Sequence, residues 1–303
     1  MKIEVTSVGD VNVDIITSNI REMPGHDSQI IINNIFMSSG GCAANFAKAI
    51  TKLGLKVRLI GKIGKDLFRD FLIRELEGVD LKLCTANKTG LTVAITFEDN
   101  SRSFITYPGG NGELTIEDID LNLIEGKYLH IPSFFLQGLR ERVVDLIKYG
   151  HEKNMIVSFD TGWDPAGWSR DDKKLVRKIL KGVDIFFPNI REASAITGLE
   201  NKEEICEDLL NLGIDIVALK MGPSGSYIAK EEDRIFIPAY RVKAIDTTGA
   251  GDVFNAAFVF CHSRDWDLEK SGRFASGAAA ISTIGYGSER YPSEEDVQKF
   301  MKS

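Results

Sequence analysis

Apolar and polar residues alternate along this chain with two periods, one typical of strands and the other typical of helices. Short apolar runs lie at residues 3–8 and 57–63, and segments with apolar positions three or four residues apart lie at 43–53 and 66–76. The alternation resumes with residues 128–131, 139–148, 155–160, 171–180 and 183–187. This order predicts a doubly wound α/β fold, in which a mostly parallel sheet carries helices on both faces.

Two stretches, residues 11–37 and 89–112, interrupt the alternation. In the second, residues 91–97 and 103–107 have strand character and flank a turn at Asp99-Asn100. Both stretches lead into glycine-rich turns, at 39–41 and 108–112. An ordinary edge hairpin remains an alternative, but the glycine-rich turns favour a small antiparallel β lid over a cleft. The α/β body then comprises residues 1–10, 38–88 and 113–303.

The last third of the chain has a different pattern. Residues 216–221, 227–229 and 235–238 predict short strands, and residues 250–261, 268–283 and 293–301 predict helices that close the chain. Neither an internal repeat nor a low-complexity linker is visible. The whole chain is therefore expected to fold around the same sheet, with the lid as an insertion.

Charge and cysteine content narrow the function classes. The 44 acidic and 37 basic residues give a net charge of −7 without a long run of either sign, which argues against a nucleic-acid-binding surface. The four cysteines are far apart in the sequence, so neither a zinc site nor a disulfide framework is indicated. No secretion signal and no apolar stretch of about 18 residues occurs. We expect a soluble, cytoplasmic protein without a membrane partner, which must hold anionic ligands locally.

Residues 246–252, Asp-Thr-Thr-Gly-Ala-Gly-Asp, carry the most informative chemistry. Gly249 and Gly251 flank Ala250 at the start of an apolar helix, where backbone N–H groups and the helix dipole can hold a phosphate. Asp252 falls in the first turn and can act as a general base beside that anion. A dinucleotide fingerprint does not fit, because its third glycine would fall on Phe254, and no GxxxxGK[ST] loop exists. The pattern indicates phosphoryl transfer.

This segment, together with Gly40-Gly41-Cys42-Ala43-Ala44-Asn45, resembles the two signatures of the ribokinase-like carbohydrate kinases, also called the PfkB family. The resemblance spans nearly the whole chain and includes residues 53–54 and 61–66. It implies that the acceptor's hydroxyls are held by Asn12, Asp14, Gly40, Gly41 and Asn45, with Asp252 taking the proton. Carboxylate and amide groups suit this task. A carboxylate accepts hydrogen bonds from hydroxyls, and an amide both accepts and donates hydrogen bonds.

The resemblance also implies a nucleotide and metal side. Asn189 and Glu192 match the family's Asn-x-x-Glu element, which organises Mg²⁺ and its waters, and hard oxygen ligands suit Mg²⁺. A capping motif is the alternative interpretation of that spacing. The residues implied to line the ATP site are Asn189, Lys220, Gly222, Gly225, Gly249, Gly251 and Ala278. The residues implied to surround a monovalent cation such as K⁺ are Asp246, Thr248, Gly285, Gly287 and Ser288.

The motif and the resemblance together predict a carbohydrate kinase that uses ATP and Mg²⁺, with Asp252 as general base and the Gly249–Asp252 backbone as anion hole. A nucleoside kinase of the same family and a catalytically silent sugar-binding sensor remain alternatives. Lids in this family often pair between subunits, so a homodimer that covers Val93, Ile95, Phe104 and Ile105 is expected. Neither the acceptor, the hydroxyl that is phosphorylated nor the preference for ATP follows from the sequence.

Overall fold

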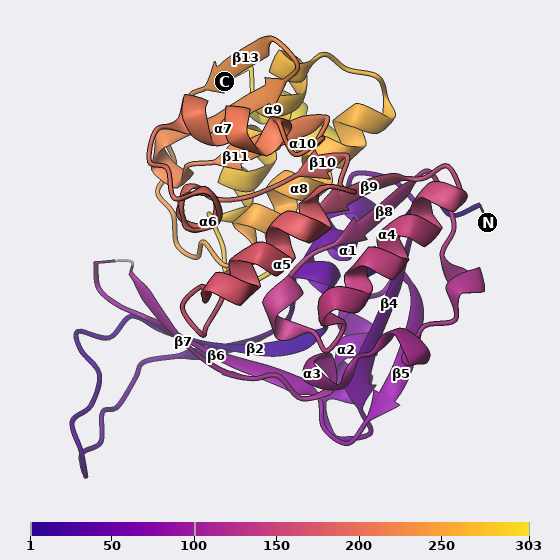
Figure 1. Cartoon of the computed structure of the whole chain (residues 1–303). Coiled ribbons are helices and arrows are strands. Elements are labelled where there is room, and N and C mark those ends of the chain that lie inside the picture. The colour runs from indigo at the N-terminus through magenta and orange to yellow at the C-terminus, as the bar shows by residue number, and fades with distance from the viewer. Residues whose placement is uncertain (1, 100, 303) are drawn as a thin grey trace.

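The computed structural model describes residues 2–99 and 101–302, which build one large sheet and one small sheet (Figure 1). The large sheet has the order β13-β12-β11-β10-β9-β8-β1-β4-β5. From β11 to β5 all neighbouring strands are parallel, and β12 and β13 add an antiparallel edge. The strands are β1 Val5–Val8, β4 Val57–Gly64, β5 Asp80–Ala86, β8 Tyr128–Ile131, β9 Ile156–Phe159, β10 Ile185–Phe186, β11 Ile216–Lys220, β12 Ser226–Lys230 and β13 Asp233–Ile237.

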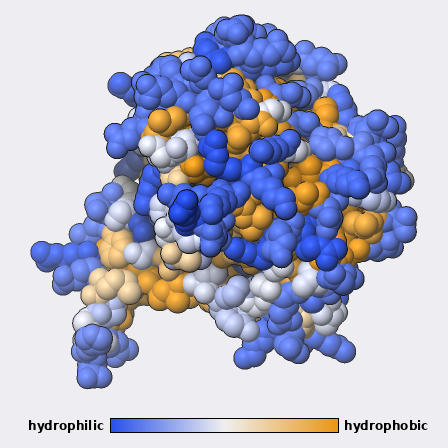
Figure 2. Space-filling model, viewed as in Figure 1, coloured by the Kyte–Doolittle hydropathy of each residue, from blue (hydrophilic) through white to orange (hydrophobic). Residues whose placement is uncertain are grey.

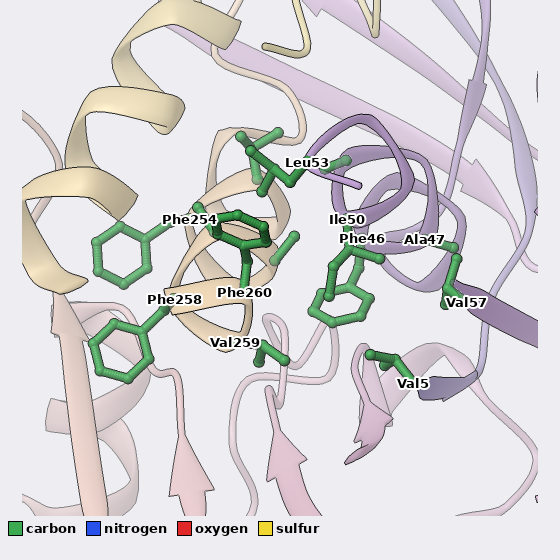
Figure 3. Close-up of a cluster of buried hydrophobic side chains, with 14 of the residues drawn as sticks. Val5, Phe46, Ala47, Ile50, Leu53, Val57, Phe254, Phe258, Val259 and Phe260 are labelled. Atoms are coloured by element: carbon green, nitrogen blue, oxygen red, sulfur yellow. The ribbon is translucent and has the colours of Figure 1, made fainter. Parts of the chain in front are cut away.

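Helices cover both faces of this sheet, as the alternation predicted. One core packs α1, α2, α8, α9 and α10 against the sheet, and the other packs α4, α5, α6 and α7 against the opposite face. Figure 3 shows side chains of α1 and α8 meeting in the first core, with Phe46 and Ile50 opposite Val259. The helices are α1 Cys42–Lys52, α2 Arg69–Glu75, α3 Gly110–Glu113, α4 Val143–Glu152, α5 Arg170–Leu180, α6 Ile190–Thr197, α7 Lys202–Leu210, α8 Ala250–Ser263, α9 Leu268–Ser282 and α10 Glu294–Phe300.

The strand–helix order forms because each element has a face to bury. Strand β1 is buried along its whole length, as expected for a parallel strand covered on both sides. Helix α8 is buried from Asp252 to Cys261, whereas α5 buries only Val176, Ile179 and Leu180. Helix α8 is therefore a central element. Its residue Asn255 is hydrogen-bonded to Asp160, which directly follows β9, and to Lys220, the last residue of β11, so the start of α8 lies at the carboxyl edge of the sheet.

The small sheet has the order β3-β2-β6-β7, with β2 Asn12–Thr17, β3 Ile35–Gly40, β6 Gly90–Thr96 and β7 Arg102–Tyr107. Two of its strand pairs are antiparallel, and β2 and β6 are parallel. The expected turn at Asp99-Asn100 includes Asn100, which lies outside the described residues. The lid projects from the body, with the long β2–β3 connection at its far end (Figure 1).

The apolar lid residues do not share one face. Val93 is paired with Ile105, and Ala94 with Phe104, so Phe104 points to the face opposite Ile105. Ile95 is only 8% exposed. The expectation that Phe104 and Ile105 form one apolar surface was wrong, because consecutive strand residues alternate. The apolar row on the outer face is instead Met37, Ile15, Val93 and Ile105, which lie side by side across the strands.

Several element bounds differ from the sequence pattern. Strand β5 was not expected, because this edge strand is only partly buried and carries no clear apolar run. Helix α2 begins at Arg69, three residues later than expected, and the side chain of Asp66 accepts from Phe68 N and Thr89 N in the turn before it. Residues 140–142 form a 3₁₀ turn before α4. Across the described part of the chain, every helix is too short or too polar to cross a membrane.

Candidate active site

The predicted phosphate-binding segment forms the turn that leads into α8. Gly249 has a φ of +75°, and a Cβ added there would lie 2.5 Å from Tyr291 Oη, so this position requires glycine. The N–H of Ala250 donates to Thr247 O at 3.3 Å. Within the described residues, the N–H groups of Gly251 and Asp252 have no acceptor. These two donors at the helix start remain available to an anion.

Asp252 lies in the first turn of α8 and is only 6% exposed. Its Oδ2 accepts a hydrogen bond of 2.9 Å from Nδ2 of Asn45 in α1. Burial raises the pKa of Asp252 to about 8, and the nearby Asp160 adds to this, while the bond from Asn45 and the charge of Lys220 act in the opposite direction. With this raised pKa the ionised carboxylate is a stronger base than an ordinary aspartate, and its population grows as the pH rises towards about 8.

The predicted acceptor residues of the lid lie at its junction with the body. Asp14 in β2 is 7% exposed, and its pKa is raised to about 7 by burial and by the charges of Asp10 and Asp246. A Cβ added to Gly40 would lie 2.0 Å from Asp14 Cγ, so only glycine leaves room for this carboxylate. Asn12 accepts at Oδ1 from Nδ2 of Asn111, whose own Oδ1 accepts from Val11 N at 2.9 Å. The lid strand β2 is thereby tied to the turn that contains Asn111.

Gly41 and Asp10 hold the start of α1 close to these groups. Gly41 has a φ of +91°, and a Cβ there would lie 2.6 Å from Asp10 O. The Asp10 carboxylate accepts from Cys42 N at 3.0 Å and from Ala43 N at 3.1 Å, so it occupies the N-terminus of α1. Burial still raises the pKa of Asp10 to about 6. Asp10 closes this helix end and adds a second carboxylate beside Asp14.

Lys220, predicted to meet the nucleotide, lies in a buried polar network beneath α8. Its Nζ is 2.6 Å from Asp160 Oδ2 and donates to Asn255 Oδ1 at 3.2 Å. Asp160 Oδ2 also accepts from Asn255 Nδ2 at 2.7 Å. Burial alone would raise the pKa of Asp160, but Lys220 and these hydrogen bonds hold it below its usual value. Lys220 therefore compensates a buried carboxylate and lends positive charge to the surroundings of Asp252.

Asn189 and Glu192 form a reciprocal capping box at the start of α6. Asn189 Oδ1 accepts from Glu192 N at 3.0 Å, and Glu192 Oε2 accepts from Asn189 N at 2.8 Å. Burial raises the pKa of Glu192 to about 7, and the charge of Asp160 adds to it. The capping interpretation of this spacing is therefore realised in the structure. A buried carboxylate next to Asp160 also has the hard oxygen chemistry that suits Mg²⁺, so the residues fit that ion.

The other predicted nucleotide residues fall into two groups. Gly222 and Gly225 have positive φ values of +56° and +97° in the turn after β11, and a Cβ on Gly225 would lie 2.1 Å from Ile237 O. Ala278 on α9 is 0% exposed and belongs to the core. The structure therefore offers no surface of Ala278 to adenine, because the small side chain packs inward. The partly exposed positions of α9 are Leu268, Ser276, Ala279, Ala280 and Ile281.

The residues implied to hold a monovalent cation surround an arginine instead. Arg102 Nη1 lies 2.6 Å from Asp246 Oδ1 and also donates to Thr248 Oγ1. Asp246 Oδ2 accepts from Gly287 N at 2.8 Å. Arg102 comes from lid strand β7, and its side chain is 8% exposed. The charged position between Asp246 and Thr248 is thus filled by a side chain of the lid.

The two remaining residues of that set, Gly285 and Ser288, have other neighbours. Ser288 Oγ accepts from Lys48 Nζ at 2.5 Å, and this lysine also pairs with Glu75 at 2.9 Å. A Cβ added to Gly285 would lie 2.5 Å from the side chain of Arg290. Among the described residues, neither forms a hydrogen bond with Asp246. Hydrogen bonds to Asp246 or Arg102 therefore link only Asp246, Thr248 and Gly287 of the five residues.

Sequence reasoning missed Asp10, Arg102, Asn255 and Tyr291. Asp10 follows a buried strand directly, which is a usable signal for a residue at the carboxyl edge of a sheet. Arg102 carried no signal, because it lies in a lid strand far in sequence from Asp246. Asn255 lies about one helical turn after Asp252. It was not singled out because the residues around it form an apolar helix pattern. Only the folded chain brings these residues close to the turn that begins α8.

A sequence profile of the pfkB family carbohydrate kinases matches residues 2–295 of this chain. An uncharacterised sugar kinase of Archaeoglobus fulgidus is 31% identical over 78% of this chain and 95% of its own length. A deoxyribokinase of Salmonella typhi is 28% identical, with 98% of each chain covered. The match extends over lid and body alike.

Solved structures agree with these relatives. A ribokinase of Thermotoga maritima superimposes with a TM-score of 0.83 at 29% identity, and covers 99% of this chain and 100% of its own. A ribokinase of Arabidopsis thaliana, solved with ribose and ATP, has a TM-score of 0.83 at 24% identity and covers 100% of both chains. At that identity the second comparison shows the shared fold.

Proposed function

The chain belongs to the pfkB family of carbohydrate kinases, and we propose that it transfers the γ-phosphoryl group of ATP to a hydroxyl of a neutral sugar. The observation that carries this proposal is that helices α1 and α8 meet at Asp252. Its carboxylate is held by Asn45 from the acceptor side, while the free N–H groups of Gly251 and Asp252 lie at the same helix start. A base and an anion hole thus share one turn of helix.

In this reaction Asp252 removes the proton from the acceptor's hydroxyl as the hydroxyl oxygen attacks the γ-phosphorus, the bond from the γ-phosphorus to the bridging oxygen breaks, and ADP leaves. The bond from Asn45 fixes the carboxylate, and the raised pKa makes its ionised form a stronger base than an ordinary aspartate. The backbone of Gly249–Asp252 donates to the phosphoryl oxygens as their negative charge spreads. The chain's own contribution is therefore positioning, proton removal and charge stabilisation.

Glu192 and Asn189 are the residues we assign to Mg²⁺, through water, at the start of α6. When bound, Mg²⁺ neutralises part of the charge on the transferred phosphoryl group. Within the described residues no group of three His, Cys, Asp or Glu side chains is arranged to hold a metal ion. Gly222 and Gly225 are assigned to the nucleotide side, in the turn after Lys220.

A neutral acceptor follows from the charges around the lid junction. Asp10, Asp14 and Asp252 are all buried, and no described Lys or Arg side chain forms an ion pair with any of them. Sugar hydroxyls can donate to such carboxylates, and Asn12 can donate or accept. A phosphate or carboxylate on the acceptor would instead add negative charge to a buried site that already holds three acidic side chains and no described cation paired with them. The site therefore favours neutral sugars over sugar phosphates and sugar acids.

An acceptor screen with ATP and Mg²⁺ tests this proposal. We expect a neutral pentose, deoxypentose or hexose to be phosphorylated, and a phosphorylated or acidic sugar to have a kcat/KM lower by about 100-fold, because an added anion would find no paired cation among the described residues of this acidic site. ADP formation above the acceptor-free rate is the measurement. Preference for a sugar phosphate or acid would contradict the neutral site, and preference for a nucleoside would make the protein a nucleoside kinase. Sugar binding without turnover would identify a sensor.

We also propose that the lids of two copies pair in a homodimer. The row of Met37, Ile15, Val93 and Ile105 supports this, since Met37 and Ile105 are 51% and 59% exposed. Figure 2 shows hydrophobic side chains gathered over this lid region.

Sedimentation equilibrium is expected to give a dimer for the wild type and a monomer for Ile105→Lys, because a buried lysine in the paired lids would lack a partner. Leu67→Lys is the matched control, since Leu67 is 81% exposed on the body, and it should remain dimeric. A monomeric wild type at micromolar concentration, or a dimeric Ile105→Lys, would contradict pairing through the lid.

A further inference from the structure

Arg102 reaches from the lid into the body, directly beneath the turn that begins α8. Its guanidinium pairs with Asp246 at 2.6 Å and donates to Thr248, the residue before Gly249. Asp246 is 1% exposed, so this ion pair is buried from solvent. An ionised carboxylate is costly to bury without a compensating charge, and for Asp246 that charge is a side chain of the same protein.

Both carboxylate oxygens of Asp246 already accept hydrogen bonds. Its Oδ1 accepts from Thr248 N at 2.8 Å and from Arg102, and its Oδ2 accepts from Gly287 N at 2.8 Å. Gly287 therefore directs an N–H, not its carbonyl oxygen, at this carboxylate. A monovalent cation needs several oxygen ligands, and it would be repelled by a guanidinium held within one hydrogen bond of the same carboxylate. The residues present do not fit a bound K⁺.

We propose that Arg102 takes the place of a monovalent cation in this kinase, so that turnover does not depend on K⁺. The guanidinium neutralises Asp246 and holds Thr248, which fixes the backbone entering the anion hole at Gly249. Because Arg102 belongs to strand β7, the same contact fastens the lid to the catalytic turn. Arg102 is a positioning residue, since it acts through Asp246 and Thr248, and its role in turnover rests on the proposed kinase activity.

The first test uses the wild type in KCl, NaCl and choline chloride at equal ionic strength. We expect kcat to differ by less than about twofold among the three salts, because Arg102 already neutralises Asp246. The thermal midpoint, which needs no acceptor, should also be equal in KCl and choline chloride. Saturable activation by K⁺ of about fivefold or more, or a K⁺-specific rise in the midpoint, would overturn the proposal. Absence of any turnover would count against the proposed function, while the thermal measurement still decides the cation question.

The second test replaces Arg102 by Gln, which keeps hydrogen-bonding capacity and removes the charge. We expect kcat to fall about tenfold or more, since a buried Asp246 loses its partner and the turn before Gly249 shifts. K⁺ should restore part of that loss, and choline should not. Arg21→Gln, on the exposed β2–β3 connection, should behave as the wild type. An Arg102→Gln enzyme with unchanged kcat and no response to salt would overturn the proposal, and the wild-type salt comparison stands if this variant does not fold.

Discussion

Replacement of Asp252 by Asn is expected to lower kcat by about 10²- to 10⁴-fold, because the amide cannot take the proton of the attacking hydroxyl. The change is nearly isosteric, and Asn45 can still donate to the new carbonyl oxygen at the position where it now meets Oδ2. ATP affinity, measured by calorimetry, should therefore change little. Asp171→Asn, with a side chain 94% exposed, is the control and should retain full activity. A kcat within threefold of the wild type would remove Asp252 from the mechanism.

The pKa of Asp252 adds a pH dependence with a defined sign. For the free wild-type enzyme, kcat/KM should rise with pH as Asp252 loses its proton and level off above its pKa of about 8. The folded-state pKa is raised, so the folded chain binds this proton more tightly than the unfolded chain. The associated stability is present at low pH and is lost as the pH rises towards about 8.

Asp252→Asn should remove this loss of stability. We expect the thermal midpoint of the variant to exceed that of the wild type by about 3 °C or more at pH 9, and the difference to shrink towards pH 5. Calorimetric scans across that range supply the measurement. A variant that is inactive and also less stable at pH 9 would indicate a structural defect, not the loss of a base.

Replacement of Lys220 by Met is expected to reduce the free energy of unfolding by about 3–5 kcal/mol, because it leaves Asp160 buried without a cation. Asp160 would then take up a proton, since burial without Lys220 raises its pKa. A raised folded-state pKa costs stability as the pH rises, so the deficit should be larger at pH 8 than at pH 5. Urea unfolding at both pH values measures it.

Lys174→Met provides the matched control for this change of charge. Lys174 pairs with Asp171 across 3.6 Å on the surface, where the two side chains are 65% and 94% exposed. Its loss should alter stability by less than about 1 kcal/mol, as solvent screens exposed ion pairs. Equal effects of Lys220→Met and Lys174→Met would show that the Lys220–Asp160 pair does not stabilise the fold.

The features that sequence reasoning predicted are those encoded locally. The turn at Gly249 needs a positive φ, and the apolar run behind it needs burial, so residues 246–258 specify a glycine turn and a core helix together. The strand–helix order specified the parallel sheet in the same way, because each parallel strand requires a covering helix. Strand β5 was not predicted, because an edge strand buries too few residues to produce a clear apolar pattern in the sequence.

Predictions that depended on a side chain's surroundings were less complete. The Asn189–Glu192 spacing is compatible with both a cap and a metal site, and the hydrogen bonds of the capping box are a property of the folded helix end. Ala278 lies on the expected helix but faces the core, because the rotation of α9 depends on its packing against α8 and α10. The rotation of a helix about its own axis cannot be predicted from a short sequence motif.

Local patterning was enough to determine the α/β fold, the glycine turn before α8 and the position of Asp252 within it, because backbone conformation and burial depend on neighbouring residues. Charge compensation was decided only by the tertiary structure. Arg102 lies 144 residues before Asp246, and Lys220 lies 60 residues after Asp160, yet each pair is joined at 2.6 Å. Which cation neutralises a buried carboxylate depends on the strands and loops that fold against it, and Coulombic attraction acts through space, not along the chain.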